Sequence, residues 1–432
     1  MPLAALDLHK KSIEAALFDD QGQALLHTRF PATRAALEAF ARQHLTPQHR
    51  VALEATFNTW AIVALLQPFV AEVVVSNPLQ TRAIAQAKVK TDPIDTNVLG
   101  HLLHCDYLPR VWIPDPETRS LRQQCTERAN LTADSTRLKN RIHGVLNQRL
   151  IEAPVKDLFA PPGRAWLRTL PLDDPGRAAL DRDLAQLALI EQQLADLGGT
   201  LAHHAYDHPQ VRLLMTLPGV DFAVAETLYS TLGDITRFPA PGRAAAYFGL
   251  VPSTYQSGEH CYHGRITKRG RAHARWMLVQ AAQHLAPHPG PLGVFFRRLA
   301  KKKNRNVAVV ATARKLVTLA WHMLKNNEPY RYAVPRTTGA KLARLRLRAT
   351  GQKRQGGNPK GQPRPATYGS GQPTRAIPSL DQVYTAAGLP PRQAGPPGET
   401  KMLVRSGLAP FVASLAEPRR VPKNTGARKP KP

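Results

Sequence analysis

The chain has 432 residues and contains 59 Lys and Arg against 31 Asp and Glu, which gives a formal net charge of +28. This imbalance argues against an ordinary metabolic enzyme and favours a polyanionic partner such as nucleic acid, although a solvated basic surface is the simpler alternative. The three cysteines show no paired spacing, so neither a disulfide framework nor a zinc ribbon is predicted. These few cysteines fit a reducing, cytoplasmic setting, and we also expect no signal peptide and no membrane span.

The first 110 residues predict a mixed α/β domain. Apolar runs and turn residues indicate three successive strands, then a helix, a strand, a helix, a strand and a last helix. The predicted elements are strands 3–8, 13–18 and 24–28, helix 35–44, strand 51–54, helix 60–70, strand 73–75 and helix 92–103. This order is compatible with an RNase H-like mixed sheet, which we predict for residues 1–110.

The next segment, residues 111–208, is predicted to be a long helical connector. Two polar helical stretches, 117–152 and 175–204, are separated by a Pro- and Gly-containing insertion over residues 154–174. They could pair as an antiparallel coiled coil that spaces the domains or forms a dimer contact. An ordinary helical subdomain is an equal alternative.

Residues 209–335 predict a second, mainly helical domain. It opens with a segment similar to a helix-hairpin-helix, Leu217-Pro218-Gly219-Val220 followed by a helix over 223–232. In such a hairpin Gly219 lets backbone N–H groups approach a phosphate without a side chain in the way. Any Pro-Gly turn between two helices would look similar.

The last segment, residues 336–432, is predicted to be a disordered basic tail. It is rich in Gly, Pro and Gln, has few aromatic residues, and contains 19 basic and 3 acidic residues. It could act as an electrostatic clamp on nucleic acid. Alternatively, it is a dispensable solubilising extension.

Four acidic residues of the first domain form a candidate metal site. Asp7 lies within an apolar strand and Glu54 at the tip of another, where an unpartnered carboxylate is costly to bury. Asp92 and Asp95 are three residues apart and so share one face of a helix. The first and fourth strands of an RNase H-like sheet are neighbours, so the four carboxylates could meet and hold paired Mg²⁺ ions, which suit phosphodiester chemistry. Taken singly, Asp92 and Asp95 could mark a helix start and Glu54 a surface charge.

Ser257 is a candidate nucleophile in the second domain. It directly precedes Gly258 on what we expect to be an irregular loop. Four basic residues follow and could form a cationic pocket that stabilises the charge of phosphoryl transfer: Arg265, Lys268, Arg269 and Arg271. The alternative is a common Ser-Gly turn beside a loop that merely contacts phosphate. The nearby His260, Cys261 and His263 lack a matching second ligand pair, so zinc is not predicted there.

Several short motifs, in a fixed order over about residues 3 to 332, resemble one known family, the transposases of insertion-sequence family 110. The matching motifs are Leu6-Asp7-Leu8-His9-Lys10, Leu53-Glu54-Ala55-Thr56, Lys90-Thr91-Asp92-Pro93-Ile94-Asp95, Leu138-Lys139-Asn140-Arg141-Ile142-His143, Leu217-Pro218-Gly219-Val220, Gly249-Leu250-Val251-Pro252, Ser257-Gly258, Arg265-Ile266-Thr267-Lys268-Arg269-Gly270 and Ala311-Thr312-Ala313-Arg314-Lys315-Leu316. Each motif is weak alone, but the ordered set is highly specific.

The resemblance implies a bacterial recombinase with a RuvC-like Asp-Glu-Asp-Asp domain and a serine-bearing transposase domain. By this analogy Asp7, Glu54, Asp92 and Asp95 bind Mg²⁺, and a serine attacks a DNA phosphate to form a covalent intermediate. Ser257 fits the family serine best because it directly precedes the glycine, and Ser253 is the second choice.

The resemblance also implies partners. Members of the family act on double-stranded DNA as element ends and target, are guided by a structured RNA from the element's own ends, and work as homo-oligomers in which one subunit's carboxylates serve another's serine. Base pairing would then read sequence while the protein reads shape and backbone. The residues expected to contact nucleic acid are Lys139, Arg141, Gly219, Arg265, Lys268, Arg269 and Arg271.

The chain departs from the family pattern at Pro93 and Thr96, which replace the more usual Arg and Ala, and in its longer tail. Pro93 is tolerated because the first turn of a helix accommodates proline. Two rival functions remain. One is a metal-dependent nuclease of the Holliday-junction resolvase type, in which the serine region only grips DNA; the other is a decayed transposase that binds nucleic acid without catalysis, against which the intact acids argue.

Overall fold

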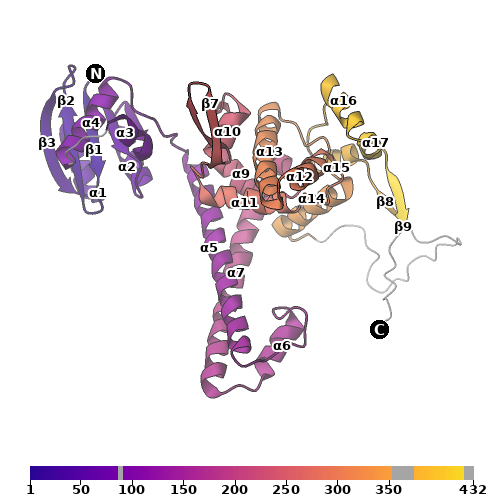
Figure 1. Cartoon of the computed structure of the whole chain (residues 1–432). Helices are drawn as coiled ribbons and strands as arrows, with labels where there is room; N and C mark the ends of the chain where they lie inside the picture. Colours follow the sequence, from indigo (N-terminus) through magenta and orange to yellow (C-terminus); the bar gives the residue numbers. More distant parts are fainter. Residues whose placement is uncertain (86–90, 353–373, 423–432) are drawn as a thin grey trace. The chain divides into compact units, whose positions relative to one another are not determined.

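The computed structural model describes residues 1–85, 91–352 and 374–422 (Figure 1). The chain divides into two compact units, Met1–Asp115 and the part that begins at Pro116. Lys90, part of one motif singled out above, lies outside the described residues. Each unit is described by itself.

Unit 1 is built on a five-stranded mixed sheet, as the sequence predicts. The strands are β1 (Leu3–Leu8), β2 (Ser12–Phe18), β3 (Ala24–Pro31), β4 (Arg50–Glu54) and β5 (Glu72–Ser76), in the order β3-β2-β1-β4-β5. The first three strands form an antiparallel meander, whereas β4 pairs in parallel with both β1 and β5. The predicted neighbourhood of the first and fourth strands is therefore confirmed.

Helices cover both faces of this sheet. Alternate strand residues point to opposite faces, so Leu6 and Leu53 pack beneath α1 (Arg34–His44) and α2 (Thr59–Leu66), which a 3-10 turn extends over Gln67–Phe69. Ala5 and Ala52 face the other way and pack against α4 (Asp92–His104). The short helix α3 (Pro78–Ile84) was not expected.

Gly100 allows α4 to lie close to the sheet. A Cβ atom at this position would come within 2.2 Å of the Phe18 ring on β2. The Phe18 side chain is fully buried together with Leu99 and Leu103 of α4. The glycine therefore sets how closely the C-terminal half of α4 approaches the sheet.

Unit 2 begins with two long helices, α5 (Pro116–Asn147) and α7 (Asp174–Asp207), as predicted. They run antiparallel and side by side, because ion pairs join Arg141 to Asp183 and Arg149 to Asp173 (Figure 1). The insertion between them contains a helix, α6 (Pro161–Thr169), that closes the tip of the pair. Leu167 of α6 is buried there against leucines of both long helices.

The remainder of unit 2 is mainly helical, as expected. Its helices share one apolar core: α8 (Pro209–Leu214), α9 (Phe222–Leu232), α10 (Pro241–Tyr247), α11 (Ala272–Gln283), α12 (Pro291–Lys302) and α13 (Arg305–Asn326). A 3-10 turn spans Ile235–Arg237, and one hairpin, β6 (Pro252–Ser257) and β7 (His260–Ile266), interrupts the helices. By length and composition α13 alone among the described helices could cross a membrane, but its apolar side chains form the middle of this core.

The predicted disorder of residues 336–432 is wrong for the part that the structure describes. It contains α14 (Pro335–Thr350), β8 (Thr374–Ile377), α15 (Leu380–Ala386), α16 (Pro397–Arg405), α17 (Ala409–Ala416) and β9 (Arg419–Pro422). The prediction relied on the average composition of the segment, which does not show the spacing of its apolar residues. Leu345, Tyr384 and Leu403 are buried in the main core. The Tyr384 hydroxyl also donates to the Tyr330 carbonyl at 2.7 Å. Residues 353–373 and 423–432 lie outside the described chain.

Replacing Gly100 by Ala should destabilise unit 1 by about 1–3 kcal/mol, because the added methyl group overlaps the buried Phe18 ring. Urea unfolding followed by circular dichroism measures the change. Gly144→Ala is the matched control, since a Cβ atom there meets nothing within 4 Å in the last turn of α5. That substitution should leave unit 2 unchanged or stabilise it by about 0.5–1 kcal/mol. Equal stability of Gly100→Ala and the unaltered chain would contradict the packing described here.

Candidate active site and nucleic-acid interface

Charged side chains form a row across the face of the sheet that α4 covers. Strand register pairs Asp7 with Glu14, and Glu14 in turn with Arg29. Glu54 stands one residue beyond Leu53, which pairs with Leu6, so it lies level with Asp7 on the adjoining strand. Directly opposed residues of neighbouring strands share a face. The row therefore reads Glu54, Asp7, Glu14, Arg29, and the largely buried Glu14 is a member that sequence reasoning missed.

The first turn of α4 brings Asp92 to this row. His9 Nε2 lies 3.2 Å from Asp7 Oδ2 and 3.3 Å from Asp92 Oδ1. Arg29 Nη1 is 3.8 Å from Asp92 Oδ2 and its Nη2 donates to the Ser12 hydroxyl at 3.0 Å. Asp7 and Asp92, 85 positions apart in the chain, are thus brought together as the sequence predicts, whereas His9 and Arg29 were not foreseen.

Glu54 and Asp95 occupy the positions expected of them but do not join the tightest cluster. Glu54 ends β4 and is half-buried, and Asp95 lies in the first turn of α4, three residues after Asp92. Asp7, His9 and Asp92 form one of two groups among the described residues whose ligand atoms all lie within 4.8 Å of one another. The structure therefore brings Asp7 and Asp92 to one shared partner, His9, while Glu54 lies on the adjoining strand and Asp95 three residues after Asp92.

The cluster has the donor set of a divalent-cation site. Carboxylate oxygens are the preferred ligands of hard cations such as Mg²⁺, and Asp7 is only 17% exposed. His9 Nε2 is shielded from solvent and has no well-aligned hydrogen-bond partner among the described residues, although it lies between two carboxylates. A shielded ring nitrogen without an aligned hydrogen-bond partner, beside paired carboxylates, suits a place for a bound cation.

Ser257 ends a strand and does not lie on an irregular loop as expected. It is the last residue of β6 and pairs with His260, the first residue of β7, across a two-residue turn. Gly258 adopts φ +56° in this turn, a conformation that favours glycine. Ser257 is exposed, whereas the second-choice Ser253 donates its hydroxyl hydrogen to the Arg265 carbonyl at 3.3 Å. The hairpin thus presents Ser257 to solvent with His260 directly beside it.

Three of the predicted basic residues beside the hairpin are exposed: Arg265, Lys268 and Arg269. The loop that carries Lys268 and Arg269 is held against Gly249, where a Cβ atom would meet the Arg269 carbonyl at 2.2 Å. Arg271 differs, because it is partly buried and donates to Thr126 Oγ1 of α5 at 3.1 Å. Burial and the nearby Arg122 guanidinium lower the pKa of Arg271. Arg271 therefore anchors the loop to α5.

The three remaining predicted contacts have structural partners. Lys139 lies 3.9 Å from Glu191 and Arg141 lies 2.5 Å from the buried Asp183, so both tie α5 to α7. Gly219 is exposed in the α8–α9 hairpin and has φ +77°. A Cβ atom there would come within 2.4 Å of the Ala281 carbonyl, so the glycine is required by packing against α11. Whether these three residues also contact nucleic acid stays a prediction.

A second histidine cluster joins α5, α7 and α9. His204 Nδ1 lies 2.8 Å from the buried Glu226, while its Nε2 and that of His208 lie 3.7 and 3.4 Å from Glu117. The two imidazole rings stack with centroids 4.1 Å apart. The ligand atoms of Glu117, His204 and His208 also lie within 4.8 Å of one another. Because the buried Glu226 carboxylate already holds His204 through Nδ1, we assign this cluster the role of joining the three helices.

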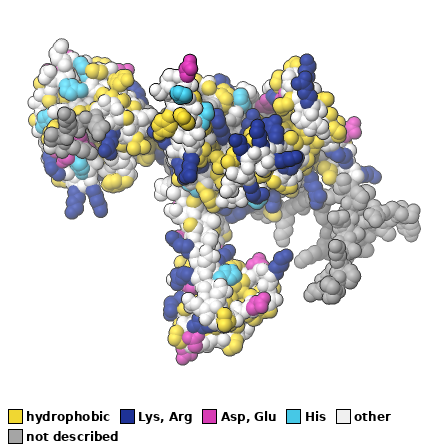
Figure 2. All heavy atoms as spheres, viewed as in Figure 1, with side chains coloured by type: hydrophobic (Ala, Val, Ile, Leu, Met, Phe, Trp, Pro, Cys, Tyr) yellow, Lys and Arg dark blue, Asp and Glu magenta, His cyan; other side chains and the backbone are white. Residues whose placement is uncertain are grey.

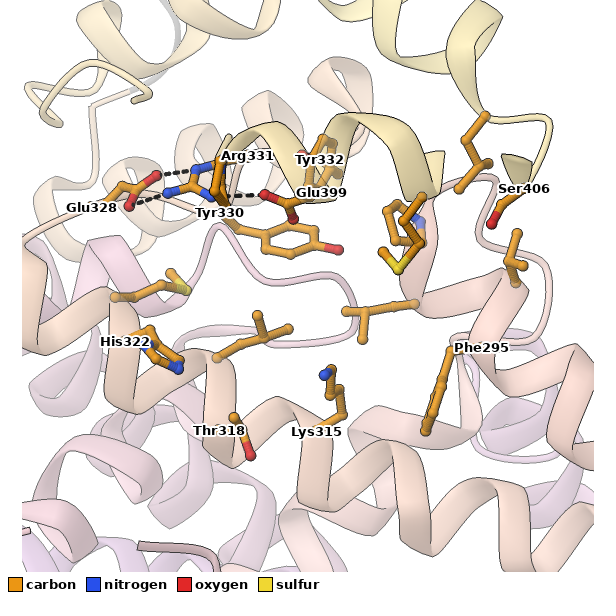
Figure 3. Close-up of a pocket in the computed structure, with 18 of the residues that line it drawn as sticks. Phe295, Lys315, Thr318, His322, Glu328, Tyr330, Arg331, Tyr332, Glu399 and Ser406 are labelled. Atoms are coloured by element: carbon orange, nitrogen blue, oxygen red, sulfur yellow. Dashed lines mark hydrogen bonds and ion pairs between the residues drawn. The ribbon is translucent and has the colours of Figure 1, made fainter. Parts of the chain in front are cut away.

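Unit 2 also contains a cavity of about 600 Å³ between α12, α13, residues 326–332 and α16. Figure 3 shows Lys315 and His322 on the α13 side and Glu399 on the opposite side. Arg331 bridges Glu328 and Glu399, which closes one wall. None of the predicted site residues lines it. Sequence reasoning missed this cavity because α16 lies in the segment predicted to be disordered.

Comparison with known proteins gives two family matches. A family model named for the DEDD transposase domain of IS110, and described as a transposase, matches residues 4–151. A second model, described as the transposase IS116/IS110/IS902 family, matches residues 211–293. The first contains all four predicted acids, and the second contains Ser257 and the basic loop.

Individual relatives agree with these matches. A transposase for insertion sequence element IS1111A of Coxiella burnetii is 28% identical over 33% of this chain and 40% of its own length. An IS110 protein of Streptomyces coelicolor is 30% identical over 39% of this chain and 42% of its own length. A transposase for IS1328 of Yersinia enterocolitica is 25% identical over 74% of this chain and 95% of its own length. The matched region is thus less than half of the length of the first two relatives.

Divalent cations should raise the unfolding temperature of unit 1 through the Asp7–Asp92 pair. At a cation concentration tenfold above the dissociation constant we expect a rise of about 5 °C, measured by differential scanning calorimetry. Asp92→Asn should abolish most of this rise because it removes one anionic ligand. Glu38→Gln, on α1 and outside the acidic row, is the control and should retain the rise. A rise that survives in Asp92→Asn would refute the assignment of this pair.

Proposed function

Because this chain belongs to the IS110 family of insertion-sequence transposases, we propose that it cuts and rejoins DNA strands during movement of a bacterial insertion sequence. The observation that carries the proposal is the convergence of Asp7 and Asp92 on one sheet face within the region matched by the DEDD transposase model. A second support is the exposed Ser257 in the region matched by the other model.

We assign the metal-binding role to the acidic row. Asp7 and Asp92, supplemented by Glu54 and Asp95, would hold Mg²⁺, whose positive charge stabilises the attacking and leaving oxygens of phosphodiester exchange. His9 and Arg29 orient the two central carboxylates through the contacts described above. Glu14 adds a further negative charge directly beside Asp7, which increases the demand for a cation at this face.

We assign the nucleophilic role to Ser257. Its Oγ atom bonds to a DNA phosphorus while the bond from phosphorus to the leaving sugar oxygen breaks, and the serine proton is transferred to that oxygen. His260 is the neighbouring side chain suited to relay this proton, since it pairs with Ser257 across the hairpin. The exposed Arg265, Lys268 and Arg269 stabilise the negative charge that develops on the phosphate.

Nucleic acid would bind to the basic surface of unit 2. Figure 2 shows Lys and Arg side chains gathered over α12 and α13, where Lys301, Lys302, Lys303 and Arg305 are all exposed. This arrangement suits recognition of the phosphate backbone. The family resemblance supports a structured guide RNA as a second partner and a homo-oligomer as the working form, and the net charge of +28 is compatible with the RNA partner.

A metal-dependent nuclease of the resolvase type is the main alternative, because the acidic row alone would suit it. The two functions differ in whether Ser257 becomes attached to DNA. The exposed serine and its histidine neighbour favour the transposase.

The deciding experiment incubates the full chain with Mg²⁺, labelled element-end and target DNA and the RNA encoded beside the gene, and resolves the products on a denaturing gel. We expect a covalent protein–DNA adduct whose yield falls at least about 100-fold in Ser257→Ala and in Asp7→Ala. Ser253→Ala is the matched control and should retain the adduct, since that hydroxyl is engaged by the Arg265 carbonyl. Cleaved DNA that requires Asp7 but not Ser257 would instead establish the nuclease.

A further inference from the structure

The ammonium group of Lys341, on α14, is surrounded by main-chain carbonyl oxygens of the α8–α9 hairpin. Its Nζ atom lies 2.5 Å from the Met215 oxygen, 2.7 Å from the Leu217 oxygen and 2.9 Å from the Val220 oxygen. These three oxygens belong to one six-residue stretch of chain. The lysine therefore interacts with the turn of the hairpin itself and not with one helix end.

The carbonyls converge because of the way the hairpin is formed. α8 ends at Leu214, and the following turn reverses the chain so that α9 can begin at Phe222. Carbonyl groups at the end of a helix lack intrahelical donors and must find other partners. Of the three, the Leu217 oxygen also accepts a long hydrogen bond from the Val220 nitrogen at 3.3 Å. The ammonium group supplies the positive charge that three converging oxygen dipoles require.

The contacts suit the charged form of the lysine. An ammonium group has three donors for three acceptors, whereas a neutral amine would leave one carbonyl unpaired. Burial lowers the pKa of Lys341 to about 7, and the nearby Asp221 carboxylate opposes that shift. The other charged or titratable groups close to the amine are Arg344 and His288.

We propose that the hairpin turn is a monovalent-cation site built of main-chain carbonyls, and that the Lys341 ammonium is its built-in cation. The ammonium group and K⁺ carry the same charge and have similar size, and rings of backbone carbonyls are known ligands of K⁺. Three neutral oxygens without a carboxylate ligand favour a single positive charge over Mg²⁺. The site is therefore complete without a metal in the natural chain and should take K⁺ when the amine is removed.

The link between this cation site and DNA binding deepens the proposed function and is the one step that rests on it. The hairpin holds Gly219 at φ +77° on the protein surface, where backbone N–H groups are available to a DNA phosphate. Lys341 fixes this turn from behind, so it is a positioning residue and makes no contact with DNA itself. It comes from α14, outside both regions that match the family models.

The test compares unfolding temperatures in potassium chloride and in N-methylglucamine chloride at equal ionic strength. Lys341→Ala opens the site and should lose about 5 °C in N-methylglucamine, but regain at least half of the loss in potassium. Lys341→Met fills the space with an apolar group and should stay destabilised in both salts. Arg344→Ala, three residues after Lys341 on α14 and exposed, is the charge control. Its unfolding temperature should be the same in both salts, like that of the natural chain.

The proposal would be overturned if the unfolding temperature of Lys341→Ala fell equally in both salts. It would also be overturned if this variant failed to fold in potassium buffers or kept the unfolding temperature of the natural chain. Binding of a labelled DNA duplex, measured by fluorescence anisotropy in the same two salts, tests the link to function. Potassium should restore duplex affinity in Lys341→Ala by about tenfold relative to N-methylglucamine. If the natural chain binds no duplex, the proposed function fails while the unfolding data still decide the cation site.

Discussion

The packing of α4 against β1 and β2 determines where the acidic groups of this protein meet. Gly100 lets the helix lie on the Phe18 ring, and the helix then begins with Asp92 at the level of Asp7. Like charges brought this close repel one another and are also costly to desolvate. Arg29 offsets part of this repulsion in the free protein, so the fold holds a site that a cation further stabilises.

Compensation of buried charge recurs in unit 2. The buried Asp183 is neutralised by Arg141 across the helical pair, and the hairpin carbonyls are satisfied by Lys341. Both cations come from segments distant in sequence from the groups they serve. Long-range pairs of this kind make the helices interdependent, because loss of one partner leaves the other buried and unsatisfied. The described residues beyond Pro335 are for this reason part of the folded body and not an appendage.

Local pattern was sufficient to predict the sheet of unit 1 and the two long helices, because strand alternation and helical spacing are readable over short windows. It also predicted that Asp7 and Asp92 converge. It did not reveal Glu14, since the neighbour of Asp7 depends on strand register. The helices after Pro335 were missed because glycine and proline dominate the composition, although Ser379 and Gln382 form a capping box that signals a helix start. Polar residues on both faces of the hairpin that carries Ser257 conceal its strand alternation, so the sequence predicts a loop there.

That hairpin has a further consequence for how the protein can vary. Most of its side chains on both strands are exposed, so no core packing fixes its length. Inserting one residue into β6 would turn Ser257 to the opposite face, whereas inserting two would keep its face and carry it about 7 Å farther from the helical body. The distance of the serine from the helical body can therefore change only in steps of two residues of hairpin length. Relatives whose hairpin differs by an odd number of residues would need a β-bulge to present the serine in the same direction.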